Sequence, residues 1–409
     1  MNSKVILLLG AYDMKGEEYD YVAACIEGRG HRTLKMDFSV IGSPKSGAVD
    51  IGAERVAEAA GSSLTALREA GDRGKAMSAM SEGAARLVRL LYDEGKFDGI
   101  FGMGGTGGSS VISAAMRSLP LGVPKVLVST AASGDTRMML DTRDITLIPS
   151  VVDVAGVNRI SRVIYREAVG AICGMVEMET EETAGTRPVV AVTMFGNTTE
   201  CVDRCRNILE NSGYEVLVFH CTGTGGRTME QLVEDGLISA VLDITTTEWA
   251  DELCGGVFAA GPDRLEAAGK AGIPHLIVPG CVDMVNFGPR ATVPDTFADR
   301  KLYIWNPGVT LMRTTPEENE RMGRIFAEKA NRAGGPTAFL LPLRGVSILG
   351  TENNEFWWPE ADQAMFSAIK TYVKDGIPVE EVDAAINDPE FADRAVGKLM
   401  ELMKGGGAA

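Results

Sequence analysis

The sequence predicts an α/β protein with two domains, each built on a doubly wound parallel β-sheet. Three observations lead to this prediction. Continuous apolar runs, of which residues 4–10 (KVILLLG) are the first, alternate with helical stretches, as in parallel strands covered on both faces. The chain of 409 residues is too long for one ordinary domain. Its second half also repeats the order of elements in the first half.

The repeat is visible in the residue types. Each half begins with an apolar run that ends in glycine and is followed by a helical stretch, a glycine and a second strand. Three pairs of segments correspond in this way: 4–10 with 188–196, 97–105 with 238–246, and 121–130 with 271–280. We interpret the two halves as related Rossmann-like units that arose by duplication.

The domain boundary is predicted in the acidic segment 176–188 (VEMETEETAGTRP), which ends in a proline just before a strand. Domain one then covers residues 1–180 and domain two covers residues 186–409. In domain one, the Ala-, Glu- and Arg-rich segment 48–95 predicts an insertion of two helices after the second strand. Domain two continues after its fourth strand with the apolar run 301–307, a helix, a further apolar run and two last helices.

The composition excludes several classes of partner. A net charge of −16 argues against nucleic acid and against an anionic membrane surface, because both select clustered Lys and Arg. No apolar run approaches the roughly 20 residues that a membrane-spanning helix needs. The seven cysteines are scattered without a CxxC pair, so no disulfide framework is expected. We therefore expect a cytoplasmic protein with a small-molecule ligand.

In open parallel sheets, ligands bind beyond the carboxyl ends of the strands. In domain one these ends carry glycine and small polar residues, above all in 101–110 (FGMGGTGGSS), which follows a strand and precedes a helix. Glycines let backbone N–H groups approach an anion, and the helix start adds positive potential. Asp13 is placed to hold Mg²⁺ and Lys15 to meet a phosphate. The predicted cofactor-binding residues are Gly10, Asp13, Lys15, Asp37, Gly104, Gly105, Thr106, Gly107, Gly108, Ser109, Ser129, Thr130 and Ser133.

Other interpretations of the glycine-rich stretch stay open. Gly102, Gly104 and Gly107 satisfy the GxGxxG pattern of nicotinamide-dependent dehydrogenases, but the next strand ends in LVST and lacks the acidic residue that binds the ribose. No GK[ST] follows, which excludes a Walker A loop. The glycines could also serve only the close packing of a helix on a strand.

Domain two repeats the arrangement with a different lining. A second glycine loop lies in 219–232 (FHCTGTGGRTMEQL), and Arg227 and Arg344 could clamp an anionic group. His220 and Glu248 are the predicted proton acceptors, although a histidine before such a loop can equally hold the loop by hydrogen bonds. The predicted substrate-binding residues are Asn197, Thr198, Thr199, Gly223, Gly225, Gly226, Arg227, Asp283, Asn286 and Arg344.

These segments resemble the Tm-1-like ATP-binding family, UPF0261, over nearly the full length. The similar segments include GAYDMKG, GMGGTGGSS, TMFGNTTECV, FHCTGTGGRTMEQL, LDITTTEWADEL and LPLRGVS. The resemblance implies two Rossmann-like domains, a homodimer, and Mg·ATP bound in domain one by GAYDMK and GMGGTGGSS. In the plant member a barrel similar to phosphoenolpyruvate hydrolases follows, so any such partner of this chain would be a separate polypeptide.

Two functions follow from these observations. In the first, the protein is a kinase- or ligase-like enzyme that holds Mg·ATP in domain one and a small polar or carboxylate metabolite in domain two, with the reaction in the cleft between them. In the second, it is an ATP-regulated binding module that works with the barrel partner. A nicotinamide-dependent dehydrogenase is the weaker third alternative, because it depends only on the GxGxxG match.

Overall fold

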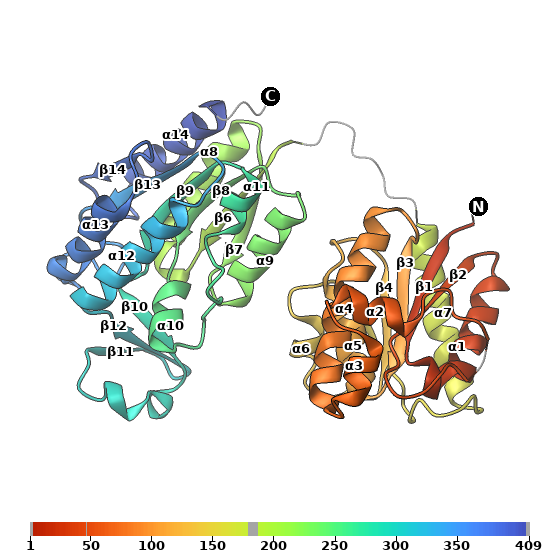
Figure 1. Ribbon diagram of the computed structural model, residues 1–409. Coiled ribbons are helices and arrows are strands. Elements are labelled where there is room, and N and C mark those ends of the chain that lie inside the picture. Colours follow the sequence, from red (N-terminus) through yellow and green to blue (C-terminus); the bar gives the residue numbers. More distant parts are fainter. Residues whose placement is uncertain (1–2, 46, 179–186, 406–409) are drawn as a thin grey trace. The chain divides into compact units, whose positions relative to one another are not determined.

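The computed structural model describes residues 3–45, 47–178 and 187–405. The chain divides into two compact units, Met1–Glu182 and Thr183–Ala409 (Figure 1). The middle of the predicted boundary segment, residues 179–186, lies outside the described residues. Each unit contains a parallel β-sheet with helices on both faces, which confirms the predicted fold class.

The first unit contains a five-stranded parallel sheet in the order β2-β1-β3-β4-β5. Alternate residues of β1 face opposite sides, as in any strand. Leu7 and Leu9 pack against α2, α4 and α5, whereas Ile6 and Leu8 pack against α1 and α7 (Figure 1). The strands are β1 Val5–Gly10, β2 Arg32–Asp37, β3 Gly99–Gly104, β4 Lys125–Ser129 and β5 Thr146–Pro149. The helices are α1 Tyr12–Glu27, α2 Ala53–Ala59, α3 Leu64–Glu69, α4 Arg73–Asp93, α5 Thr106–Arg117, α6 Arg137–Leu140 and α7 Ser161–Glu177.

The insertion forms three helices, α2, α3 and α4, where the sequence predicted two. Gly61 and Gly71 adopt positive φ angles of 74° and 62°, so the chain turns sharply at both. A new helix then begins after each turn: Ser63 Oγ accepts from the backbone N–H of Ala66 and Asp72 Oδ1 accepts from that of Lys75. These turns and caps divide the insertion into three helices.

The second unit contains a six-stranded parallel sheet in the order β14-β13-β9-β8-β6-β7. In chain order its first five strands are β6, β7, β8, β9 and β13. They lie in the sheet in the order second, first, third, fourth, fifth, which is also the order in the first unit, so the repeat in the sequence corresponds to a repeat in topology. The strands are β6 Val189–Met194, β7 Glu215–His220, β8 Ala240–Thr245, β9 His275–Gly280, β13 Thr337–Pro342 and β14 Val379–Val382. The helices are η1 Gly196–Thr198, α8 Thr199–Asn211, α9 Thr224–Glu234, α10 Glu248–Cys254, α11 Ala267–Ala271, η2 Arg290–Thr292, η3 Asp295–Phe297, α12 Pro316–Ala330, α13 Pro359–Tyr372 and α14 Pro389–Gly405.

A small antiparallel sheet in the second unit was not predicted. It has the order β10-β12-β11, from β10 Met284–Phe287, β11 Leu302–Asn306 and β12 Val309–Arg313. The apolar run 301–307 therefore belongs to a hairpin outside the main sheet. Asn306 Oδ1 accepts from the N–H of Gly308 at 2.8 Å and forms the turn of this hairpin.

Candidate functional site

The candidate site lies where the strand order of the first unit reverses, at the carboxyl ends of β1 and β3. This is the place where ligands bind in sheets of this order. A pocket of about 270 Å³ is present there, which we call the glycine pocket. Its walls come from the end of β3, the start of α5, the start of α1, the insertion helix α4 and two loops. It is lined by Ala11, Met14, Lys15, Phe38, Arg73, Met103, Gly104, Gly105, Thr106, Gly107, Gly108 and Asp153.

The glycine loop leaves free space above its backbone. A Cβ atom added at Gly105, Gly107 or Gly108 would have its nearest neighbours at 3.8, 3.8 and 4.0 Å. Gly102 differs, because a Cβ there would lie 2.4 Å from Ile112 Cγ2. The first glycine of the GxGxxG pattern thus serves helix packing and the second, Gly104, lies close to the backbone of Gly108, whereas the third, Gly107, faces the pocket. The first backbone N–H groups of α5 have no partner within their helix, and their residues Thr106, Gly107 and Gly108 line the pocket.

Two cations line the glycine pocket. Arg73, the first residue of α4, is exposed, and its Nη2 atom lies 4.0 Å from the position that a Cβ of Gly107 would take. Among the described residues Arg73 has no ion-pair partner. Lys15 is half-buried, and its Nζ donates to the backbone oxygen of Val154. Arg73 was missed by the sequence analysis, because nothing near it in the chain shows that α4 brings it over a loop some 30 residues further on.

An apolar chamber of about 460 Å³ adjoins the glycine pocket. The insertion provides much of its wall, and the chamber shares Ala11, Met14, Phe38, Arg73, Gly107 and Gly108 with the glycine pocket. The side chains that make it apolar are Met14, Phe38, Val40, Ile41, Leu67, Ala76 and Met77. A hollow lined by glycine backbone, two cations and Asp153 therefore adjoins a larger apolar one.

The acidic candidates of this domain differ in position. Asp13 lines the apolar chamber, and its Oδ2 accepts from the N–H of Gly42 at 3.1 Å. Asp37 is buried, and its Oδ1 accepts from the N–H groups of Tyr12 and Ser39 at 3.0 and 2.9 Å. Burial raises the pKa of Asp37, although these hydrogen bonds act in the opposite direction. Asp37 therefore shapes the loop, whereas Asp13 is open to a ligand.

The remaining predicted residues of this domain do not line the glycine pocket. A Cβ at Gly10 would lie 2.1 Å from Tyr19 Cε2, so this glycine is needed for packing. Ser109 is buried, and its Oγ lies 2.7 Å from that of Ser129. Ser129, Thr130 and Ser133 line a separate pocket at the ends of β4 and β5. The predicted cofactor-binding residues thus fall into groups. Some line the glycine pocket, Asp13 lines the apolar chamber, three line the pocket at β4 and β5, and Gly10, Asp37 and Ser109 are buried in the packing behind them.

In the second unit, the glycine loop is occupied by a side chain of the protein itself. Glu248 Oε1 accepts from the N–H groups of Gly223 and Gly226 at 2.8 and 3.1 Å. A Cβ at Gly226 would lie 2.0 Å from Glu248 Oε2. Arg264 is fully buried and donates from Nε to that same Oε2 at 2.8 Å. Burial raises the pKa of Glu248, and Arg264 and the N–H of Gly223 lower it in part.

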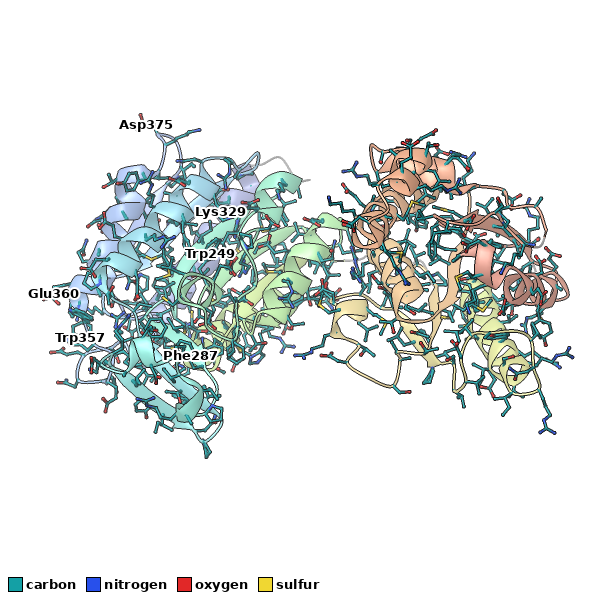
Figure 2. All side chains as sticks on the ribbon, turned by 60° about the horizontal axis from the view of Figure 1, so that its bottom comes forward. Trp249, Phe287, Lys329, Trp357, Glu360 and Asp375 are labelled. Atoms are coloured by element: carbon teal, nitrogen blue, oxygen red, sulfur yellow. The ribbon has the colours of Figure 1, made fainter. Side chains whose placement is uncertain are left out.

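Arg264 connects this carboxylate to a wider buried network. It forms a bidentate pair with Asp243 at 2.6 Å for each bond, and it also reaches Glu230 at 3.1 Å. Burial would raise the pKa of Asp243, but Arg264 holds it below its ordinary value. Nearby, Lys329 lies over the ring of Trp249 at 5.0 Å (Figure 2). The carboxyl edge of this sheet is therefore a packed polar interior.

The other predicted residues of the second unit mostly bond to neighbouring groups of the same unit, although Asn197 Oδ1, Asp283 Oδ1 and Asn286 Oδ1 are buried without a hydrogen-bond partner in the described part of the chain. Five hydrogen-bond pairs show this: Thr198 Oγ1 with Thr245 Oγ1 at 2.7 Å, Asn197 Nδ2 with Met284 Sδ at 3.6 Å, Thr199 Oγ1 with Gly196 O at 3.2 Å, Asn286 N with Asp251 Oδ1 at 2.6 Å, and Ser347 Oγ with Asp283 Oδ2 at 2.6 Å. Arg344 is exposed and pairs with Asp383 at 2.7 and 2.8 Å. Gly225 packs on the backbone of His220, and Arg227 is half-buried in α9. His220 is exposed at the end of the edge strand β7.

Comparison with known proteins identifies the family. Residues 4–181 match the model described as Uncharacterised protein family (UPF0261) N-terminal domain, and residues 187–403 match that of the C-terminal domain. The chain belongs to the UPF0261 family. A UPF0261 protein of Clostridium tetani is 48% identical over 99% of this chain and 100% of its own length. UPF0261 protein RA0729 of Rhizobium meliloti is 46% identical over 98% of this chain and 99% of its own length.

The UPF0261 chain is also similar to a plant protein. The ToMV resistance protein Tm-1(GCR237) of Solanum lycopersicum is 42% identical over 81% of this chain, and the match covers 45% of the tomato protein. These matches confirm the resemblance drawn from the motifs. Within the described part of this UPF0261 chain, no helix has the length and apolar character to span a membrane.

Proposed function

We propose that the first domain of this UPF0261 protein binds Mg·ATP. The observation that supports this most is the glycine pocket: the first N–H groups of α5, the ammonium of Lys15 and the guanidinium of Arg73 surround one hollow of about 270 Å³. Backbone N–H groups at a helix start and a nearby arginine are the standard means of binding phosphate. The residues present fit the nucleotide that the resemblance implies.

The two adjoining hollows suit the two ends of a nucleotide. The phosphates would lie along Gly105–Gly108, where the backbone is open, and the base would lie in the apolar chamber beside Phe38 and Met77. Asp13 lines the chamber beside Ala11 and Met14, which border both hollows, and there it would hold Mg²⁺ together with phosphate oxygens and waters, since Mg²⁺ in such sites takes only one or two protein carboxylates. Among the described residues no group of three His, Cys, Asp or Glu side chains forms a separate metal cluster.

We further propose that the protein is an enzyme that uses ATP to act on a small polar or carboxylate metabolite, in the manner of a kinase or ligase. Phosphoryl transfer needs mainly positioning and neutralisation of charge, which Lys15, Arg73 and the helix start would supply. Of the two predicted proton acceptors, His220 is exposed, whereas Glu248 is bound to Arg264 and to the second glycine loop.

One observation favours a second candidate function. Two candidate groups at the carboxyl edge of the second sheet already have partners within the chain: Glu248 fills the glycine loop, and Arg344 is paired with Asp383. A domain closed in this way suits an ATP-regulated binding module, a homodimer whose chemistry takes place in a separate barrel partner. If the protein is a binding module, it should bind ATP without releasing phosphate. If it is an enzyme, it should consume ATP when a suitable acid or alcohol is present.

The experiment is a thermal melt of the pure protein with Mg·ATP, with Mg²⁺ alone and with NADH. A ligand at a hundred times its Kd adds about 2.7 kcal/mol to the stability of the domain that binds it. We expect a shift with Mg·ATP only. Lys15→Ala should reduce this shift and lower the unliganded melt only by the loss of its hydrogen bond to Val154, about 1 kcal/mol. No shift with Mg·ATP would contradict the proposal, and a shift with NADH instead would point to a dehydrogenase.

A further inference from the structure

The pocket at the ends of β4 and β5 is not explained by nucleotide binding. We call it the acceptor pocket. It has a volume of about 400 Å³ and is lined by Ser129, Thr130, Ser133, Pro149, Ser150, Val151, Val152 and Asp153. Four of these eight residues carry hydroxyl groups, one carries a carboxylate, and no lysine or arginine is among them. This lining suits a ligand with hydroxyl groups and disfavours an anion.

The acceptor pocket is directly adjacent to the glycine pocket. Asp153 lines both. Thr130 Oγ1 lies only 3.8 Å from the position that a Cβ of Gly105 would take, and the N–H of Thr130 donates to the oxygen of Gly104 at 3.3 Å. The buried hydroxyl pair of Ser109 and Ser129 holds the two loops together. A ligand in the acceptor pocket would therefore lie beside phosphates bound at the glycine loop.

Three polar side chains of the acceptor pocket are available to a ligand. Ser129 already bonds to Ser109 and accepts from the N–H of Ala131 at 3.0 Å. By contrast, Thr130, Ser133 and Asp153 are exposed, and no side-chain hydrogen bond joins any of them to another described residue. Two hydroxyls and a carboxylate can donate to and accept from several hydroxyl groups of one small molecule.

The backbone of this pocket is strained at one residue. Val151 has a φ of 64°, which is unusual for a β-branched residue, and 72% of its surface is exposed. The N–H of Val152 donates to the oxygen of Ser150 at 2.7 Å, so residues 150–152 form a γ-turn of the rare, strained kind. Such strain tends to gather at binding sites, where it fixes a loop in one conformation. Here the turn leads directly into Asp153.

We propose that the first domain binds a second ligand, a small neutral polyhydroxylated molecule, in the acceptor pocket, where it accepts a phosphoryl group from ATP. The transfer of a phosphoryl group from ATP rests on the proposed function, whereas binding of the ligand does not. A hydroxyl oxygen of the ligand forms a bond to the γ-phosphorus as the bond from that phosphorus to the bridging oxygen of ADP breaks. The hydroxyl proton passes to the carboxylate of Asp153, which borders both pockets.

The test uses methyl NMR on the intact protein. Val151 and Val152 report on the acceptor pocket, whereas Met14 and Met77 report on the nucleotide hollow. The protein is titrated with glycerol, erythritol and ribitol, and with glycerate and erythronate as matched anions, before and after addition of Mg²⁺ with a non-hydrolysable ATP analogue. We expect a saturable shift of the valine methyls with at least one polyol and none with the anions.

Variants connect this response to the pocket. Ser133→Ala should weaken binding of that polyol about tenfold, as expected for one lost hydrogen bond. Ser110→Ala removes an exposed hydroxyl of α5 that lines neither pocket and should change nothing. With authentic ATP the same polyol should accelerate ADP formation. Asp153→Asn should lower kcat for this reaction by roughly 100-fold, within the usual range for a lost general base. The polyol should still shift the valine methyl signals of this variant, because the substitution removes the base and not the pocket.

The possible failures are distinguishable. Valine methyls that ignore every polyol, or that respond to the anions instead, overturn this inference while the methionine shifts leave nucleotide binding intact. Binding of a polyol with no acceleration of ADP formation overturns the assigned role in phosphoryl transfer. Methionine methyls that ignore the nucleotide overturn the proposed function itself.

Discussion

The two glycine loops of this protein look alike in sequence and differ in what faces them. Above Gly107 of the first loop there is open space and an arginine, whereas Gly226 of the second loop packs against the carboxylate of Glu248. Both loops present backbone N–H groups at a helix start. In the second, the chain supplies its own anion and a buried arginine to balance it. Glycine content thus shows where the backbone can bind an anion, and the facing side chains decide whether a ligand is needed.

The largest effect is expected from removing the carboxylate of the second loop. Glu248→Ala leaves the N–H groups of Gly223 and Gly226 unpaired and Arg264 with one acidic partner fewer in a buried site. We expect a loss of about 3–5 kcal/mol in the free energy of unfolding. All four tryptophans, Trp249, Trp305, Trp357 and Trp358, belong to the second unit, so their fluorescence in urea measures this directly.

Glu252→Ala is the matched control for that change. Glu252 lies on the same helix, α10, and forms no ion pair with any described residue. The Glu252→Ala substitution should change the urea midpoint of unfolding little. Equal losses for Glu248→Ala and Glu252→Ala would show that the first substitution acts on the helix and not on the loop.

A pair of alanine substitutions compares the loops themselves. Gly226→Ala places a methyl group 2.0 Å from Glu248 Oε2 and should cost about 2–3 kcal/mol, since a packed interior must shift. Gly107→Ala has its nearest neighbour at 3.8 Å and replaces a glycine in the first turn of α5, so stability should be unchanged or rise by up to ~1 kcal/mol. Calorimetric unfolding of both variants tests this, and a destabilised Gly107→Ala would contradict the open loop.

The cation above the first loop should contribute to affinity more than to stability. Arg73→Ala should weaken Mg·ATP binding by roughly 10- to 100-fold in isothermal titration, the effect of one charge-assisted contact. Lys75→Ala, two residues further along α4 and highly exposed, serves as the control and should leave affinity nearly unchanged. Equal losses in the two variants would mean that the general charge of α4, and not the position of Arg73, matters.

The smallest effect concerns acid stability of the second domain. Burial would raise the pKa of Glu266, but Lys329 and Lys270 together lower it to about 2 from an ordinary value of 4.5. Because the folded-state pKa is depressed, Glu266 stabilises the fold above pH 4.5, and this contribution is lost as the pH falls toward 2. Glu266→Gln should cost about 1–2 kcal/mol at pH 7 and little at pH 2. Tryptophan-detected urea titrations at both pH values measure it; an equal cost at both would contradict this assignment.

Sequence reasoning recovered the parts that depend on local pattern. Buried runs such as 5–10 and 99–104 predicted parallel strands, and the order of strands in both halves follows the repeat. It missed the sheet formed by β10, β11 and β12, because short hairpin strands give little signal beside buried parallel ones. It could not show that Gly10 packs on Tyr19 or that Glu248 reaches the second loop, since both depend on which residues meet in three dimensions.

For the candidate site, the sequence indicated the edge of the sheet at which the glycine pocket lies, but not how the predicted residues divide between separate pockets. Lys15 and Gly104–Gly108 line the glycine pocket, whereas Ser129, Thr130 and Ser133 line the neighbouring one. Arg73 had no local signature, because its role depends on the path of an insertion. Distances between loops are set by packing, and a single sequence does not contain them.

Amide hydrogen exchange with and without Mg·ATP tests the central comparison most directly. The open first loop predicts that exchange slows on nucleotide addition at residues 104–109 and is unchanged at residues 223–226, where Glu248 already binds the N–H groups. Slowed exchange at 223–226, or no change at 104–109, would contradict the account that only the first loop is open to an external anion.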